Sequence, residues 1–166
     1  MKQIIFTLAA AFSWSLAAAA SPQTVTDEDI YYVAATLYGE GYREGPAGML
    51  AILETIENRS VMKGKSLKDV CLQQRQYSAW NKDAPASKML RLLAEGQSST
   101  NPTIDAAFKD VVAITRDALE HPDRERQLDR SALHYWAPNQ MSEAPYWYDG
   151  QPTVRIGNHV FVYGVE

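Results

Sequence analysis

Between residues 26 and 120, hydrophobic residues recur every three or four positions, which is the spacing of helices that bury one face. Polar and glycine-rich stretches interrupt this spacing at residues 74–83 and 96–102, so we expect separate helices joined by irregular segments. The pattern predicts helices from Thr26 to about Gly39, from Gly45 to residues 62–64, from Ser66 to about Val70, over residues 86–95, and from Asn101 to the residue before His121.

Residues at the predicted helix starts support these boundaries. Thr26 is a favourable N-cap, and the acidic residues 27–29 follow it in the first turn. Pro46 is tolerated at the start of the second predicted helix, because the first turn of a helix has unpaired N–H groups anyway. In this second helix residues 49–56 supply the buried stripe, and three polar residues are expected to lie largely off it: Glu54, Glu57 and Asn58.

After residue 130 the pattern changes from helical to extended. Residues 146–148 predict a strand that ends in an Asp149-Gly150 turn. Residues 153–156 and 159–163 predict a hairpin closed by the two-residue turn Gly157-Asn158. Helices first and a small antiparallel sheet last is an α+β layout.

The first twenty residues have the features of a secretory signal peptide. Lys2 is basic, residues 4–16 are apolar, and three alanines precede Ser21, which predicts cleavage after Ala20. We therefore expect residues 21–166 to form one domain, secreted to a bacterial periplasm or cell wall. The alternative is an uncleaved N-terminal membrane anchor; after cleavage no membrane span is expected.

Charge and cysteine content narrow the class of protein. Residues 21–166 hold all 20 acidic residues and 15 of the 16 basic ones. This excess of negative charge argues against binding to nucleic acid or to an anionic membrane surface. Cys71, the single cysteine, lies in an apolar run and is expected to be a buried small hydrophobe rather than a nucleophile.

Glu40 stands between Gly39 and Gly41 at the predicted junction of two helices. Glycines allow other backbone or a ligand to come close. A carboxyl group in the last turn of a helix also faces the negative end of the helix dipole, which favours the protonated form that a general acid needs. The alternative is an ordinary solvated helix end with a glycine C-cap.

Four clusters, the first of them around Glu40, combine aromatic rings with amide or imidazole groups: residues 38–45, 74–81, 133–138, and Trp147 together with 157–161. Each lies in a predicted loop or strand end, where binding sites concentrate. Flat sugar faces stack on aromatic rings, and amides bond hydroxyl and acetamido groups. The clusters therefore favour a carbohydrate groove.

The same blocks resemble a bacterial family of cell-wall hydrolases that includes the catalytic domain of the spore-cortex-lytic enzymes. Residues 38–41 match its glycine-flanked glutamate, and a Gly-x-x-Gly helix then ends in Asn58-Arg59. Residues 76–81 match its Gln-Phe-Ser-x-Trp block, with Tyr77 in place of Phe. Residues 132–138 and 157–161 match Ala-x-His-aromatic-aromatic and Gly-x-His-x-Phe blocks, and the common order makes the resemblance specific.

The resemblance implies a lysozyme-like α+β fold, a helical core with a small C-terminal antiparallel sheet, and action on the glycan strands of peptidoglycan. It implies that Glu40 is the catalytic residue. No cofactor or metal is expected, and the protein is expected to act as a monomer. The residues expected to contact substrate are Tyr38, Gln76, Tyr77, Ser78, Trp80, Asn81, His134, Tyr135, Trp136, Trp147, Asn158 and His159.

The number of acidic residues in these clusters bears on the reaction. Hydrolysis of a glycosidic bond ordinarily needs two carboxyl groups. Glu44 is accounted for by Arg43 and solvent, so the single acid Glu40 favours lytic transglycosylation, in which the muramyl 6-hydroxyl replaces water and a 1,6-anhydro end forms. A muramidase-type hydrolase is the alternative, with Asp149 or Glu143 as its second carboxylate.

Two other classes of protein stay open. A zinc amidase would use His134 and His159 with a carboxylate, although no closely spaced ligand pair is present. A non-catalytic peptidoglycan-binding module would use the same aromatic residues and have no need of Glu40. Substitution of Glu40 separates an enzyme from such a module.

Overall fold

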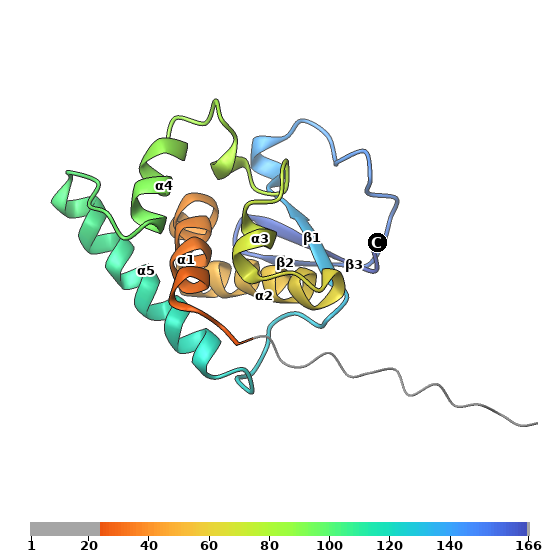
Figure 1. The fold of residues 1–166 in the computed structure, drawn as a ribbon. Coiled ribbons are helices and arrows are strands. Elements are labelled where there is room, and N and C mark those ends of the chain that lie inside the picture. Colours follow the sequence, from red (N-terminus) through yellow and green to blue (C-terminus); the bar gives the residue numbers. More distant parts are fainter. Residues whose placement is uncertain (1–23, 166) are drawn as a thin grey trace, which may run out of the picture.

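The computed structural model describes residues 24–165, and the predicted signal peptide lies outside them (Figure 1). Its fold is α+β, with a helical core and one small antiparallel sheet. The elements are α1 (Asp27–Gly41), η1 (Tyr42–Glu44), α2 (Gly45–Lys63), α3 (Leu67–Cys71), η2 (Ser78–Trp80), α4 (Ser87–Ala94), α5 (Pro102–Glu120), β1 (Ala132–Trp136), η3 (Pro138–Gln140), β2 (Thr153–Ile156) and β3 (His159–Tyr163).

The five predicted helices are confirmed, and side-chain capping contacts fix the starts of three of them, α1, α3 and α5. Thr26 and Asp29 form a reciprocal capping box at α1, each side chain accepting a hydrogen bond from the other's backbone N–H at 3.1 Å. Ser66 accepts from the backbone N–H of Asp69 at α3, and Asn101 caps α5. These contacts are local in sequence, so the sequence alone specifies them.

The core is arranged around α1, which packs against α2, α3, α4 and α5 (Figure 1). Residues 33–37 are all buried, so this helix is covered on every side rather than along one stripe. The thiol of Cys71 is fully buried here, as predicted, and burial raises its pKa to about 12, so it stays protonated at neutral pH.

The sheet has the order β1-β3-β2, with both pairs antiparallel. The predicted hairpin of β2 and β3 is confirmed, but the strand predicted over residues 146–148 is wrong. The backbone N–H of Tyr148 donates to the carbonyl of Pro145, which makes a turn there. The third strand is β1, and the rings of Trp147 and Tyr148 pack against its Trp136 at 5.9 and 5.0 Å.

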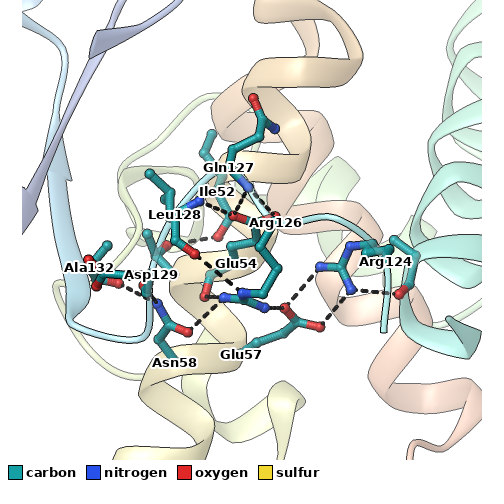
Figure 2. A network of polar contacts seen from close by, with 12 residues as sticks. Ile52, Glu54, Glu57, Asn58, Arg124, Arg126, Gln127, Leu128, Asp129 and Ala132 are labelled. Atoms are coloured by element: carbon teal, nitrogen blue, oxygen red, sulfur yellow. Dashed lines mark hydrogen bonds and ion pairs between the residues drawn. The ribbon is translucent and has the colours of Figure 1, made fainter. Parts of the chain in front are cut away.

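A buried carboxylate on α2 anchors the connection between α5 and β1 (Figure 2). Glu54 is 1% exposed, so the expectation that it lies off the buried face is wrong. Its carboxylate accepts hydrogen bonds from the backbone N–H groups of Gln127, at 3.1 Å, and Leu128, at 2.8 Å. Backbone donors from an irregular segment thus satisfy a charge that would otherwise be costly to bury.

The next turn of α2 makes further contacts with the same connection between α5 and β1. Glu57 forms ion pairs with Arg124, at 2.9 Å, and Arg126, at 2.5 Å. Asn58 is also buried, and its amide donates to the carbonyls of residues 129 and 132 at 2.8 and 2.9 Å. The predicted polar face of α2 is therefore an internal face that fixes where β1 begins.

We predict that Glu54→Gln lowers the free energy of unfolding by about 2–4 kcal/mol, because its new amide N–H₂ would oppose the two backbone donors. Urea unfolding of the purified protein measures this loss. Glu125→Gln is the matched control, since Glu125 is exposed in the same connection, and should change stability by less than about 0.5 kcal/mol. Equal effects of the two substitutions would contradict the anchoring role.

Candidate active site

Glu40 lies in the last turn of α1, where the η2 segment meets it. Its Oε1 accepts hydrogen bonds from the hydroxyl of Ser78 at 2.9 Å and the backbone N–H of Ala79 at 2.7 Å. Since both groups donate to Oε1, a proton on this carboxyl group would occupy Oε2. Oε2 has no hydrogen-bond partner among residues 24–165 and is the atom available to a ligand.

Gly39 makes this approach possible. A Cβ at position 39 would lie 2.6 Å from the Cβ of Ala79 and 2.9 Å from a methyl group of Leu90. Any larger residue would push η2 away and remove the two donors from Glu40. The expectation that a glycine beside Glu40 permits close backbone approach is confirmed.

A cavity of about 890 Å³ opens beside Glu40. The structure brings together seven of the twelve predicted substrate residues in its lining: Gln76, Ser78, Asn81, Tyr135, Trp136, Trp147 and His159. They come from the segment after α3, from β1, from β3 and from the irregular chain between β1 and β2. Tyr38 lines an adjoining hollow that also contains Glu40.

The remaining four predicted residues lie elsewhere. Tyr77 and Trp80 are 1% and 7% exposed and pack mainly in the core, where the Trp80 Nε1–H donates to Thr36 at 2.9 Å. Both also border a second hollow next to the cavity. His134 packs against Trp147 at 5.1 Å without lining the Glu40 cavity. Asn158 lies in the turn between β2 and β3.

Three residues that line the cavity carry buried polar atoms without a hydrogen-bond partner in the described part of the chain: Gln76 Oε1, the Tyr135 hydroxyl and His159 Nδ1. Buried polar atoms in native proteins are almost always paired with protein, water or a ligand. Unused hydrogen-bonding capacity is therefore concentrated in the walls of the Glu40 cavity.

Burial sets the protonation of these groups. Burial, and secondarily the charge of Glu40, raises the pKa of Tyr135 well above 10.0, so its hydroxyl remains a donor. Burial lowers the pKa of His159 from 6.5, although the charges of Glu44 and Glu40 oppose this shift. Burial also lowers the pKa of His134, to about 4. Both imidazoles are therefore neutral at neutral pH.

Arg59 is a cavity residue to which the sequence analysis gave no role. Its side chain is 4% exposed, lines the Glu40 cavity and donates to the Tyr77 hydroxyl at 2.8 Å. Within residues 24–165 it has no carboxylate within ion-pair distance. The signal in the sequence was the Asn58-Arg59 pair at the end of a helix, where a basic residue also complements the helix dipole.

Glu44 has a structural role that the sequence analysis missed. Its carboxylate accepts from the backbone N–H of Asn158 at 2.7 Å and from the side-chain amide at 3.1 Å, rather than pairing with Arg43. Gly157 has a φ of 61°, and a Cβ there would overlap the Glu44 carboxylate. Glu44 thus clamps the turn between β2 and β3 to η1. The residue it holds, Asn158, directly precedes His159.

The two candidate second acids are placed differently. Glu143 lines the Glu40 cavity from the irregular segment after η3. Asp149 is exposed and is not part of that lining. Among residues 24–165, no three His, Cys, Asp or Glu side chains gather closely enough to hold a metal ion. In the same part of the chain, no helix is long and apolar enough to cross a membrane.

A sequence model of the family described as Cell Wall Hydrolase matches residues 43–162. The chain belongs to this family. The match begins three positions after Glu40, so the candidate acid lies just outside it. No curated protein sequence matches the chain.

A solved structure has the same fold. It is the catalytic domain of the germination-specific lytic transglycosylase SleB from Bacillus anthracis. The TM-score is 0.55 and the sequence identity 22%, over 85% of this chain and 98% of that one. At this identity the likeness shows the fold alone, and the fold class is thus α+β and lysozyme-like.

We predict that the clamp at Glu44 depends on pH. The Asn158 backbone N–H holds the pKa of Glu44 below its ordinary value of 4.5, against a smaller opposing effect of burial. A depressed pKa in the folded state stabilises the protein above 4.5, and this stabilisation is lost as the pH falls through the folded-state pKa.

The measurement is the difference in unfolding free energy between the wild type and Glu44→Gln, at neutral pH and at successive values below 4.5. The wild type should be more stable at neutral pH, and the difference should vanish in acid. Asn158→Ala is the control, because it keeps the backbone donor and most of the pH dependence. A difference that does not change with pH would contradict the clamp.

Proposed function

We propose that this member of the cell wall hydrolase family cleaves the glycan strands of peptidoglycan between N-acetylmuramic acid and N-acetylglucosamine, with Glu40 as the single acid and base. The observation that carries the proposal is the placement of Glu40. One carboxylate oxygen is fixed by Ser78 and Ala79. The other has no partner within residues 24–165 and lies beside a cavity lined with aromatic and polar residues.

The reaction we propose is lytic transglycosylation. Oε2 of Glu40 gives its proton to the glycosidic oxygen, and the bond from that oxygen to the muramyl anomeric carbon breaks. The Glu40 carboxylate then takes the proton of the muramyl 6-hydroxyl as its oxygen bonds to the anomeric carbon. The products are a 1,6-anhydromuramic end and a new N-acetylglucosamine end, and no water is consumed.

Hydrolysis is a second candidate because Glu143 also lines the cavity. A second carboxylate would activate water or stabilise the positive charge of the transition state. We also propose that the protein acts as a monomer. We propose that it acts outside the cytoplasm, which agrees with the predicted signal peptide and with the location of the substrate.

We predict that Glu40→Gln lowers the rate of peptidoglycan release by at least about 100-fold, because the amide cannot supply a proton. Binding to insoluble peptidoglycan should persist within about threefold, because the amide keeps the shape of the side chain. Mass spectrometry of the soluble fragments should find anhydromuramic ends with the wild type only. Unchanged fragment release by the variant would exclude a catalytic Glu40, and no release by either protein would favour a binding module.

The substitutions Glu143→Gln and Asp149→Asn distinguish the two reactions. Under transglycosylation both variants should keep activity within about threefold and should still yield anhydromuramic ends, because neither carboxylate takes part. Under hydrolysis the wild type should yield reducing ends, and Glu143→Gln should lose activity. Asp149→Asn is the matched control, because Asp149 lies on the same irregular segment but outside the cavity lining.

A further inference from the structure

The Glu40 cavity adjoins two further hollows. One, of about 1120 Å³, is lined by residues 72–75, 77–86 and Arg91, and shares Arg75, Ser78 and Asn81 with the cavity. We call this hollow the long arm. The other, of about 550 Å³, shares Gly39, Glu40 and Gln140 with the cavity. Hollows with common walls are adjacent, and we infer that together they form one groove past Glu40.

The long arm is positively charged, although the protein as a whole carries a net charge of −4. Its lining contains Arg75, Lys82 and Arg91 against the single acid Asp83. Within residues 24–165 none of the three cations lies within 4.0 Å of a carboxylate. These three charges are therefore not needed for ion pairs inside the described part of the protein.

The backbone of Arg75 supports a ligand-binding role. Its φ of 63° lies in the left-handed region, which residues other than glycine rarely adopt. Such a conformation costs free energy and tends to persist where function requires it. Arg75 lines both the cavity and the long arm, so it stands where a ligand would pass from one to the other.

The guanidinium of Arg91 is oriented by an aromatic ring and remains available to a ligand. Its guanidinium lies 5.6 Å from the centre of the Trp80 ring, which orients the group without neutralising it. An oriented guanidinium is suited to bind a carboxylate through two parallel hydrogen bonds. The long arm thus offers three exposed cations, Arg75, Lys82 and Arg91, and the last of them is oriented by Trp80.

The sugar rings of a glycan strand are neutral and give no reason for such a charged surface. In peptidoglycan, negative charge comes from the carboxylates of the peptide stems attached to the muramyl residues. We propose that the long arm binds the stem carboxylates, so that the protein selects strands that carry peptides. This inference rests on the proposed function, because it takes the glycan strand to lie along Glu40.

The test measures binding in the Glu40→Gln background, in which bound strands stay intact. The variants are Arg75→Gln/Lys82→Gln and Arg91→Gln, and Lys88→Gln is the control because Lys88 is exposed on α4 but is not part of the arm. The ligands are soluble peptide-bearing strands, the same strands after enzymatic removal of their stems, and N-acetylglucosamine oligomers, which have no carboxylate.

We expect the double variant to bind peptide-bearing strands about tenfold more weakly, and Arg91→Gln about threefold more weakly, since exposed ion pairs are individually weak. The lost affinity should be the part that salt suppresses. Binding of the neutral oligomers should be the same in all variants, and Lys88→Gln should behave as its parent. Arg75→Gly/Lys82→Gln, whose glycine suits the left-handed backbone, should reproduce the loss if the first double variant folds poorly.

Two results would overturn the inference. One is unchanged affinity of the double variant for peptide-bearing strands. The other is equal affinity of the parent protein for strands with and without stems, which would mean that the stem carboxylates add nothing to binding. Cleavage by the protein with an intact Glu40 is assayed separately, so loss of the proposed function is distinguishable from loss of stem recognition.

Discussion

The contact on which the rest of the structure depends is the burial of the Glu54 carboxylate beneath the backbone of residues 127 and 128. After α5 the chain must return across the molecule to begin β1, and the intervening residues form no helix or strand. Hydrogen bonds and ion pairs from one face of α2 fix that path. Since β1 carries Tyr135 and Trp136 to the Glu40 cavity, the same contacts that stabilise the fold also place one wall of the site.

Glu54 and Glu40 show how two glutamates on neighbouring helices come to have different roles. Both oxygens of Glu54 accept hydrogen bonds from backbone N–H groups, so neither oxygen is left for chemistry. Within residues 24–165 only one oxygen of Glu40 is held, and the held oxygen fixes the orientation of the other. Stability and catalysis thus make opposite demands on a carboxylate. A buried structural carboxylate needs hydrogen bonds to both oxygens, whereas a catalytic one needs one oxygen held and the other free.

The sequence predicted features whose causes are local. N-cap residues and glycine turns gave the helix boundaries and the β2–β3 hairpin, because their hydrogen bonds join residues a few positions apart. The errors concern contacts distant in sequence. Residues 146–148 have strand-forming aromatic side chains, but the rings of Trp147 and Tyr148 pack against Trp136 and the segment does not pair in the sheet.

The same distinction between local and distant contacts separates the site residues that were predicted from those that were not. The glycine beside Glu40 and most of the aromatic and amide residues around the cavity were foreseen, because their residue types are characteristic of the chemistry. Arg59 and Glu44 were not, since their roles depend on partners 18 and 114 positions away. A polar residue on a helix is ordinarily assigned to solvent, and only the tertiary structure of this protein shows which of them are internal.

The way in which the two candidate acids, Glu40 and Glu143, are held in place favours lytic transglycosylation, which needs a single carboxylate. A catalytic carboxylate must be held within a fraction of an ångström of its productive position. Glu40 meets this condition through α1, η2 and two hydrogen bonds, whereas Glu143 is exposed, lies on an irregular segment and accepts no hydrogen bond from residues 24–165. An attacking hydroxyl supplied by the substrate is positioned by the bound strand itself. If the groove binds a glycan strand past Glu40, as we propose, the bound strand does the work that a second fixed carboxylate does in a hydrolase.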